Sequence, residues 1–301
     1  MIESIFLYKL IAAFLITNSH MGPLYGRFDA LALGGALGNT FFFIASGFLA
    51  SKKRDSFFTY MKKRVIRIWP SVVVVTVIMY IMGELPEYET VGEMLSACIF
   101  PTAFWFVNAV IVCYILLYFV NSYFEKYQTQ IIFGFLFAYL FYYLLIFDLK
   151  TASLESGYGK VLYLFPAMII GEKMKMTYTL VKKKAFQLWG WTGMASVIWL
   201  FLQLVSKRHP MLQILVPFSS IALGVFFLEL LLYHEDRITE LNSRIKTIIH
   251  EIANATLEIY LVQVVIIRYM ANHLQLAVIP ATFILIFGVA VILRKILNVK
   301  R

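Results

Sequence analysis

Residues 99–120 read IFPTAFWFVNAVIVCYILLYFV, a run of 22 residues without a single charged side chain. An α-helix needs about 20 predominantly apolar residues to cross the hydrocarbon core of a bilayer. Inside that core every backbone N–H and C=O group must find its partner within the segment, which an α-helix achieves. The stretch therefore predicts a transmembrane helix.

Similar apolar runs recur along the whole chain. Of the 301 residues, 61% are hydrophobic and only 15% are charged, whereas soluble domains are roughly half apolar and about a quarter charged. The predicted fold class is all-α, a polytopic transmembrane helical bundle of about ten spans that forms one domain over residues 1–301. The predicted spans are residues 4–18, 30–50, 70–83, 99–120, 131–147, 160–172, 188–205, 213–233, 255–271 and 276–293.

The basic residues predict how the bundle is oriented. With a cytoplasmic N-terminus, 20 of the 27 Lys and Arg residues fall in inside loops and two within spans. The five remaining ones lie in outside loops: Arg27, Lys150, Lys160, Lys207 and Arg208. Cytoplasmic loops are enriched in Lys and Arg, so this bias predicts that both termini are cytoplasmic. It also accounts for the net charge of +10 without a nucleic-acid partner.

Two polar residues of the first span, Lys9 and His20, are the first candidates for chemistry. They are eleven residues apart, so they share a helix face and lie about 16 Å apart along the axis. This arrangement fits a polar channel through the protein, in which a neutral His acts as general base near pH 7. The alternative is an interfacial His with a Lys whose side chain extends to the membrane surface.

A basic segment, KKRVIRIWP at residues 62–70, precedes the third span. Arg64 and Arg67 are three residues apart and share a helix face at the cytoplasmic surface. Two guanidinium groups there can grip phosphate groups bidentately, while Pro70 opens or bends the span. The alternative is an ordinary topology anchor on anionic lipid.

Further polar side chains lie within apolar runs. Ser46 and Gly47 follow the aromatic residues of the segment FFFIASGFL at residues 41–49. Trp105 shares a helix face with Asn108. Polar groups in a bilayer need partners and should face the bundle interior. Polar contacts between helices explain these residues equally well. The two cysteines show no metal-ligand spacing.

The order of these segments resembles the integral-membrane acyltransferase-3 family, which includes O-acetyltransferases of polysaccharides and sugars. The matching elements are the basic residue eleven positions before a His (Lys9, His20), the phenylalanine-rich stretch ending Ser-Gly-Phe (Phe41 to Phe48), the K/R-R-x-x-R-x-x-P element (Lys63, Arg64, Arg67, Pro70), the Trp-bearing helix that ends in Tyr (Trp105, Tyr114) and the Ser/Thr-x-x-I-Y-L element (Thr256 to Leu261). Three positions depart from the family pattern. Lys9 stands where Arg is usual, Asn108 where an acidic residue or His is frequent, and Gln263 where His is frequent.

The resemblance implies a multi-pass protein of the bacterial cytoplasmic membrane that transfers an acyl group, usually acetyl. The donor would be cytoplasmic acetyl-CoA, with no permanently bound cofactor, and the acceptor a hydroxyl of a cell-surface glycan or lipid-linked sugar. His20 would be the general base or a transient acyl relay, and Lys9 would hold charge in the cavity. Arg64 and Arg67 would bind the CoA phosphates with Ser46 beside them, and Trp105 and Asn108 would line the acyl path.

The main alternative is a transporter or flippase that moves a sugar or a lipid-linked intermediate without chemistry. Such proteins also need a polar interior and charges within the membrane. Many of them carry internal repeats with paired broken helices, and the sequence shows no such pairing. A scaffold or sensor is a further alternative, but it leaves Lys9, His20 and the two arginines unexplained.

Overall fold

The computed structural model describes residues 2–50, 56–85, 90–100, 104–146, 158–177, 185–273 and 279–297. Within these ranges the regular structure is entirely helical, which confirms the all-α prediction. The long helices are α1 (Glu3–His20), α3 (Gly35–Phe48), α4 (Phe57–Ile81), α6 (Trp105–Tyr123), α7 (Gln128–Phe141), α8 (Val161–Thr177), α9 (Ala185–Val205), α10 (Val216–Tyr233), α13 (Thr256–His273) and α14 (Ile279–Ile296). The shorter ones are α2 (Gly22–Tyr25), α5 (Val91–Ile99), α11 (Glu235–Thr239) and α12 (Ser243–Asn254).

Each of the ten predicted spans coincides with one of the long helices. Six helical segments of the described chain are long and apolar enough to cross a membrane, and eight qualify if two bent pairs each count as one span. The chain is therefore a multi-pass membrane protein. The count of ten spans and the cytoplasmic location of both termini stay predictions.

The predicted start of the third span at residue 70 is wrong, because α4 already begins at Phe57. The Ser56 hydroxyl caps this start by accepting a hydrogen bond from the Thr59 amide at 3.4 Å, as N-cap residues do. Pro70 lies inside α4 rather than at its start. The basic segment is consequently part of the same helix as the apolar one.

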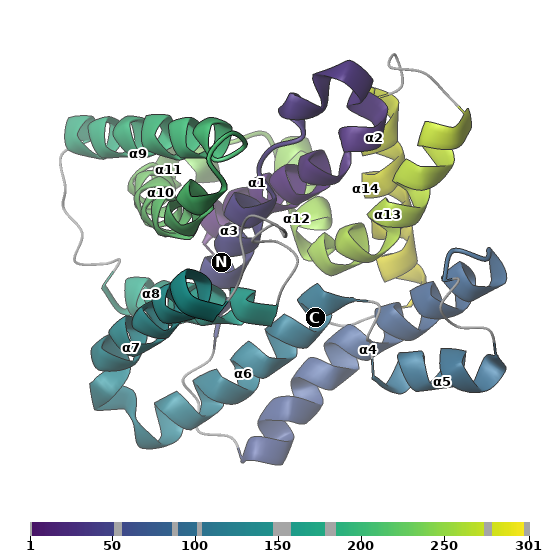
Figure 1. Ribbon diagram of the computed structural model, residues 1–301, viewed down its shortest axis with the longest axis horizontal. Helices are drawn as coiled ribbons and strands as arrows, with labels where there is room; N and C mark the ends of the chain where they lie inside the picture. Colours follow the sequence, from purple (N-terminus) through teal and green to yellow (C-terminus); the bar gives the residue numbers. More distant parts are fainter. Residues whose placement is uncertain are drawn as a thin grey trace.

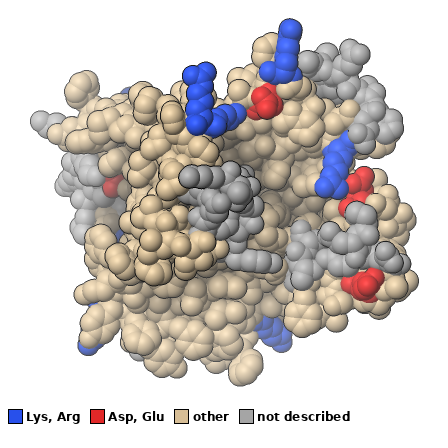
Figure 2. Space-filling view, viewed as in Figure 1, with Lys and Arg blue, Asp and Glu red and all other residues tan. Residues whose placement is uncertain are grey.

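The outer surface of the bundle is largely apolar. Most of the face in Figure 2 is uncharged, with a few Lys, Arg, Asp and Glu residues near its edges. Large side chains on α7 and α9 are strongly exposed, among them Phe133, Phe137 and Phe186. Exposed apolar area of this extent requires lipid around it, since water would make it unstable.

Helices α1 and α3 lie at the centre of the bundle, with the other long helices around them (Figure 1). Helix α3 packs against α1, α8 and α10. Its closest neighbour is α8, because a Cβ atom on Gly47 would lie 1.8 Å from the Met168 carbonyl oxygen and one on Gly171 would lie 2.0 Å from that of Ile44. The two backbones thus touch directly, which small residues permit in membrane helices.

The amino end of α1 is anchored by a carboxylate from α11. Glu235 accepts hydrogen bonds from the backbone amides of Glu3 at 2.7 Å and Ser4 at 2.8 Å. These amides have no partner within their own helix, and a negative charge is favourable at a helix amino terminus. Nearby, Arg294 at the end of α14 lies 3.7 Å from Glu251 of α12. Segments that the charge bias assigns to one side of the membrane therefore meet at one end of the bundle.

We predict that Gly171→Ala destabilises the bundle, because its methyl group would collide with the α3 backbone. Overpacking of this kind costs about 1–3 kcal/mol, which corresponds to a fall in melting temperature of roughly 2–10 °C. Gly134→Ala on α7 is the matched control, since a Cβ atom there meets nothing within 4 Å. Thermal unfolding of both variants in detergent measures the difference, and equal melting temperatures would contradict the proposed contact.

Candidate active site

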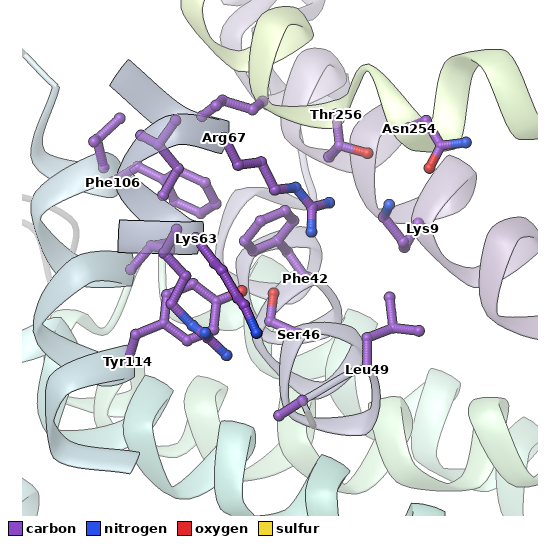
Figure 3. A pocket seen from close by; sticks show the side chains of 16 residues that line it. Lys9, Phe42, Ser46, Leu49, Lys63, Arg67, Phe106, Tyr114, Asn254 and Thr256 are labelled. Atoms are coloured by element: carbon purple, nitrogen blue, oxygen red, sulfur yellow. The ribbon is translucent and has the colours of Figure 1, made fainter. Parts of the chain in front are cut away.

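A cavity of about 220 Å³ lies where α1, α3, α4, α6 and the junction of α12 with α13 meet (Figure 3). Four of the side chains that line it are basic, namely Lys9, Lys63, Arg64 and Arg67. The other polar ones are Ser46, Tyr114, Asn254 and Thr256. No carboxylate belongs to this lining in the described part of the chain, so all of its charged side chains there are basic.

Arg64 is held rigidly at the cavity wall by two aromatic rings. Its guanidinium carbon lies 3.3 Å from the ring centroid of Tyr60 and 4.7 Å from that of Tyr114. One guanidinium N–H group also donates to the Tyr60 backbone carbonyl at 2.9 Å. The buried Nε has no hydrogen-bond partner among the described residues. Cation–π contacts of this kind fix the guanidinium plane, which prepares it for a planar or phosphate-like anion.

Helix α4 also places Lys63 and Arg67 at the cavity, because positions 63, 64 and 67 share one helix face. Both side chains are exposed, so the cavity is open at this mouth. In Figure 3 they point toward a central space that they share with Ser46 and Lys9. Both arginines therefore line a cavity instead of lying flat on a membrane surface, which favours a bound ligand over a simple lipid anchor.

Lys9 contributes the fourth positive charge from the interior of the bundle. Only 5% of its surface is exposed, and its amino group faces the Arg67 guanidinium across the cavity (Figure 3). Like charges repel more strongly in a low-dielectric interior than in water. Glu258, a buried carboxylate two residues after the cavity-lining Thr256, accepts a hydrogen bond from Ser71 at 2.6 Å. A polyanionic ligand in the cavity would interact favourably with these cations.

The junction between α12 and α13 supplies two lining residues that the sequence analysis did not single out for a role, Asn254 and Thr256. The chain bends by 72° at this break, and Asn254 and Thr256 flank it. The Thr256 hydroxyl donates to the carbonyl of Ala253 at 2.7 Å, which satisfies one group at the end of α12. The sequence signals at this point are the Ser/Thr-x-x-I-Y-L element that begins at Thr256 and the change from an amphipathic to an apolar segment.

Three of the predicted site residues lie away from the cavity: His20, Trp105 and Asn108. His20 is the last residue of α1, and its side chain is exposed. Lys160 lies within electrostatic range of His20, and its ammonium group sits 3.5 Å from the ring centroid of Trp105. His20, Trp105 and Lys160 thus belong to a second polar region, near the end of α1 opposite its Glu235 cap.

Aromatic side chains form part of the cavity wall. Phe106 is 1% exposed and lines the cavity, and its ring centroid lies 4.9 Å from that of Phe42 and 4.5 Å from that of Tyr260. The cavity lining does not include His20. A continuous polar channel from the cavity to His20 therefore stays a prediction.

The comparisons with known proteins identify the family of the chain. A family model described as an acyltransferase domain matches residues 2–295, which is nearly the whole chain. No curated protein and no solved structure gives a significant match. The family match covers both polar regions and every helix between them, and on this basis the chain belongs to the acyltransferase-3 family.

Proposed function

We propose that the protein is an O-acetyltransferase that takes acetyl groups from cytoplasmic acetyl-CoA and transfers them to a hydroxyl of a cell-surface glycan or lipid-linked sugar. The observation that carries this proposal is the cavity with four cations in its wall. CoA is the acyl donor whose phosphate groups match such a cavity. The family membership supplies the reaction class, and the cavity supplies a place for the donor.

The donor would bind through its phosphates. Arg64, fixed between two tyrosine rings, and Arg67, three residues further along α4, would form bidentate hydrogen bonds with phosphate oxygens. Lys63 and Lys9 would add charge, and Ser46 would donate or accept a hydrogen bond. Sites for whole drug-sized ligands usually measure about 300–1,000 Å³. The cavity is smaller, so it would hold part of CoA while the remainder occupies the open mouth.

His20 would act on the acceptor at the opposite end of α1. A neutral imidazole there can take the proton of a sugar hydroxyl. The hydroxyl oxygen would then attack the thioester carbonyl carbon, the carbon–sulfur bond would break, and the proton would leave on the CoA thiol. Trp105 and Lys160 lie beside His20 and would form part of the wall that holds the acceptor. Asn108, one turn further along α6, would contact the acyl path.

We predict that Arg67→Ala weakens CoA binding about 10- to 100-fold, the range expected for losing hydrogen bonds to a charged group. Isothermal titration of purified protein with CoA measures this. Arg268→Ala is the matched control, because this arginine is exposed, lies outside the cavity lining and forms an ion pair with Glu84 at 3.1 Å. A transporter of sugars should not bind CoA, so absence of binding by the unmodified protein would contradict the proposed function.

We predict that His20→Ala lowers acetyl transfer about 10²- to 10⁴-fold, the usual contribution of a general base. CoA affinity should stay within about twofold, because His20 does not line the cavity. Mass spectrometry of surface polysaccharide from cells with verified protein levels measures the acetylation. His209→Ala, an exposed histidine elsewhere, should keep full acetylation. Full acetylation in the His20→Ala cells would reject the assigned role.

A further inference from the structure

Gln263 is a buried polar residue of α13 whose amide is only half satisfied. The Thr17 hydroxyl donates to Gln263 Oε1 at 3.0 Å, and both residues are fully buried. The amide nitrogen Nε2 has no hydrogen-bond partner among the described residues. Buried N–H donors nearly always have an acceptor, because otherwise they carry the full cost of their lost hydration. A donor that no described residue pairs is available to an acceptor that arrives with a ligand.

The position of Gln263 follows from two helix registers. Thr17 precedes His20 by three residues on α1, so it lies about 4.5 Å further inward along the axis. On α13, Gln263 follows the cavity-lining Thr256 by seven residues, which places both on one face about 10.5 Å apart. The hydrogen bond between Thr17 and Gln263 joins these two faces. The amide therefore lies between the cavity and His20.

We propose that Gln263 is a further catalytic residue, whose Nε2–H group donates a hydrogen bond to the carbonyl oxygen of the acyl group during transfer, and that Thr17 orients it. This inference rests on the proposed function. When the acceptor oxygen bonds to the carbonyl carbon, the carbonyl π electrons move to its oxygen, which becomes an oxyanion. Gln263 stabilises this charge while His20 holds the proton. The carbonyl then reforms, the carbon–sulfur bond breaks, and the thiolate takes the proton from His20.

The role of Thr17 explains why Gln263 presents nitrogen and not oxygen to the ligand. A glutamine amide has one accepting and one donating end. Since the Thr17 hydroxyl donates to the oxygen, the nitrogen is turned to the other side. A donor that is fixed before the reaction costs no reorganisation when the charge develops, which is why donors of this kind contribute strongly to acyl transfer.

The main test is the rate of acetyl transfer by Gln263→Met, a change that keeps the length of the side chain and removes the donor. We expect kcat to fall about 10²-fold, the usual effect of losing one such donor. The KM for acetyl-CoA should rise by no more than about fivefold, the effect of one neutral hydrogen bond, because the phosphate-binding cations lie at the other end of the path. Ser220→Ala is the matched control, since Ser220 is also fully buried with an unpartnered hydroxyl, but lies on α10.

A second pair of variants tests the orienting role without touching the donor. Thr17→Val keeps the shape of the side chain but removes its hydroxyl, and should lower kcat about tenfold. Thr17→Ser restores the hydroxyl and should restore most of the rate. If Gln263→Met cannot be recovered as folded protein, this pair decides the question. Equal rates for the Val and Ser variants would then overturn the proposal.

Binding of two CoA derivatives separates a catalytic role from a merely structural one. Acetyl-CoA carries the carbonyl oxygen, whereas S-ethyl-CoA has a methylene group in its place. Without acceptor, the unmodified protein should bind acetyl-CoA about fivefold more tightly, as expected for one neutral hydrogen bond, and Gln263→Met should bind both equally. An unchanged preference in Gln263→Met, or an unchanged kcat, overturns the proposal. Failure of the unmodified protein to transfer acetyl groups would instead reject the proposed function.

Discussion

The direct backbone contact between α3 and α8 is the constraint on which the site depends. The hydrophobic effect does not drive helices together in lipid, so close packing has to do so. Gly47 and Gly171 allow this packing, and they fix the rotation of α3 about its axis. With Gly47 facing α8, Phe42 and Ser46 on a neighbouring face line the cavity. The contact between α3 and α8, which lies outside the cavity, therefore determines where the α3 side chains of the cavity wall lie.

The cavity brings four cationic side chains into one wall. Arg64 is stabilised by tyrosine rings in place of a carboxylate, which keeps the charge available to a ligand. Since Lys63 and Arg67 are exposed and Lys9 is buried, the charge extends from the mouth into the bundle. An anionic donor would meet cations first at the entrance and then deeper along its path. This graded arrangement suits a long molecule whose phosphates lie at one end.

Periodicity and hydropathy predicted the helices well, because each long apolar run has to be helical in lipid. They missed the start of α4, since the basic segment lowers the local hydropathy although Ser56 caps a helix there. The eleven-residue spacing of Lys9 and His20 could be interpreted in advance, because both lie on one helix.

Features that join separate helices could not be predicted in this way. The contact of Lys160 with Trp105, the bend beside Asn254 and the unpaired amide of Gln263 all depend on how helices pack. A helix register shows which face is polar, but not which side chains of other helices pack against that face.

Each of the two polar regions would serve a different step of the proposed transfer. Lys9 and His20 lie about 16 Å apart along α1, so a donor bound by its phosphates at one end must extend its acyl group toward the other. A continuous water-filled channel would let ions leak across the membrane and would weaken every electrostatic interaction at the reacting carbonyl. Phe42 and Phe106 of the cavity wall, with Tyr260 packed against Phe106, make this part of the interior largely apolar. A narrow, largely apolar passage with a single amide donor would admit a thin thioester arm and exclude water, which is the environment that acyl transfer to a sugar hydroxyl requires.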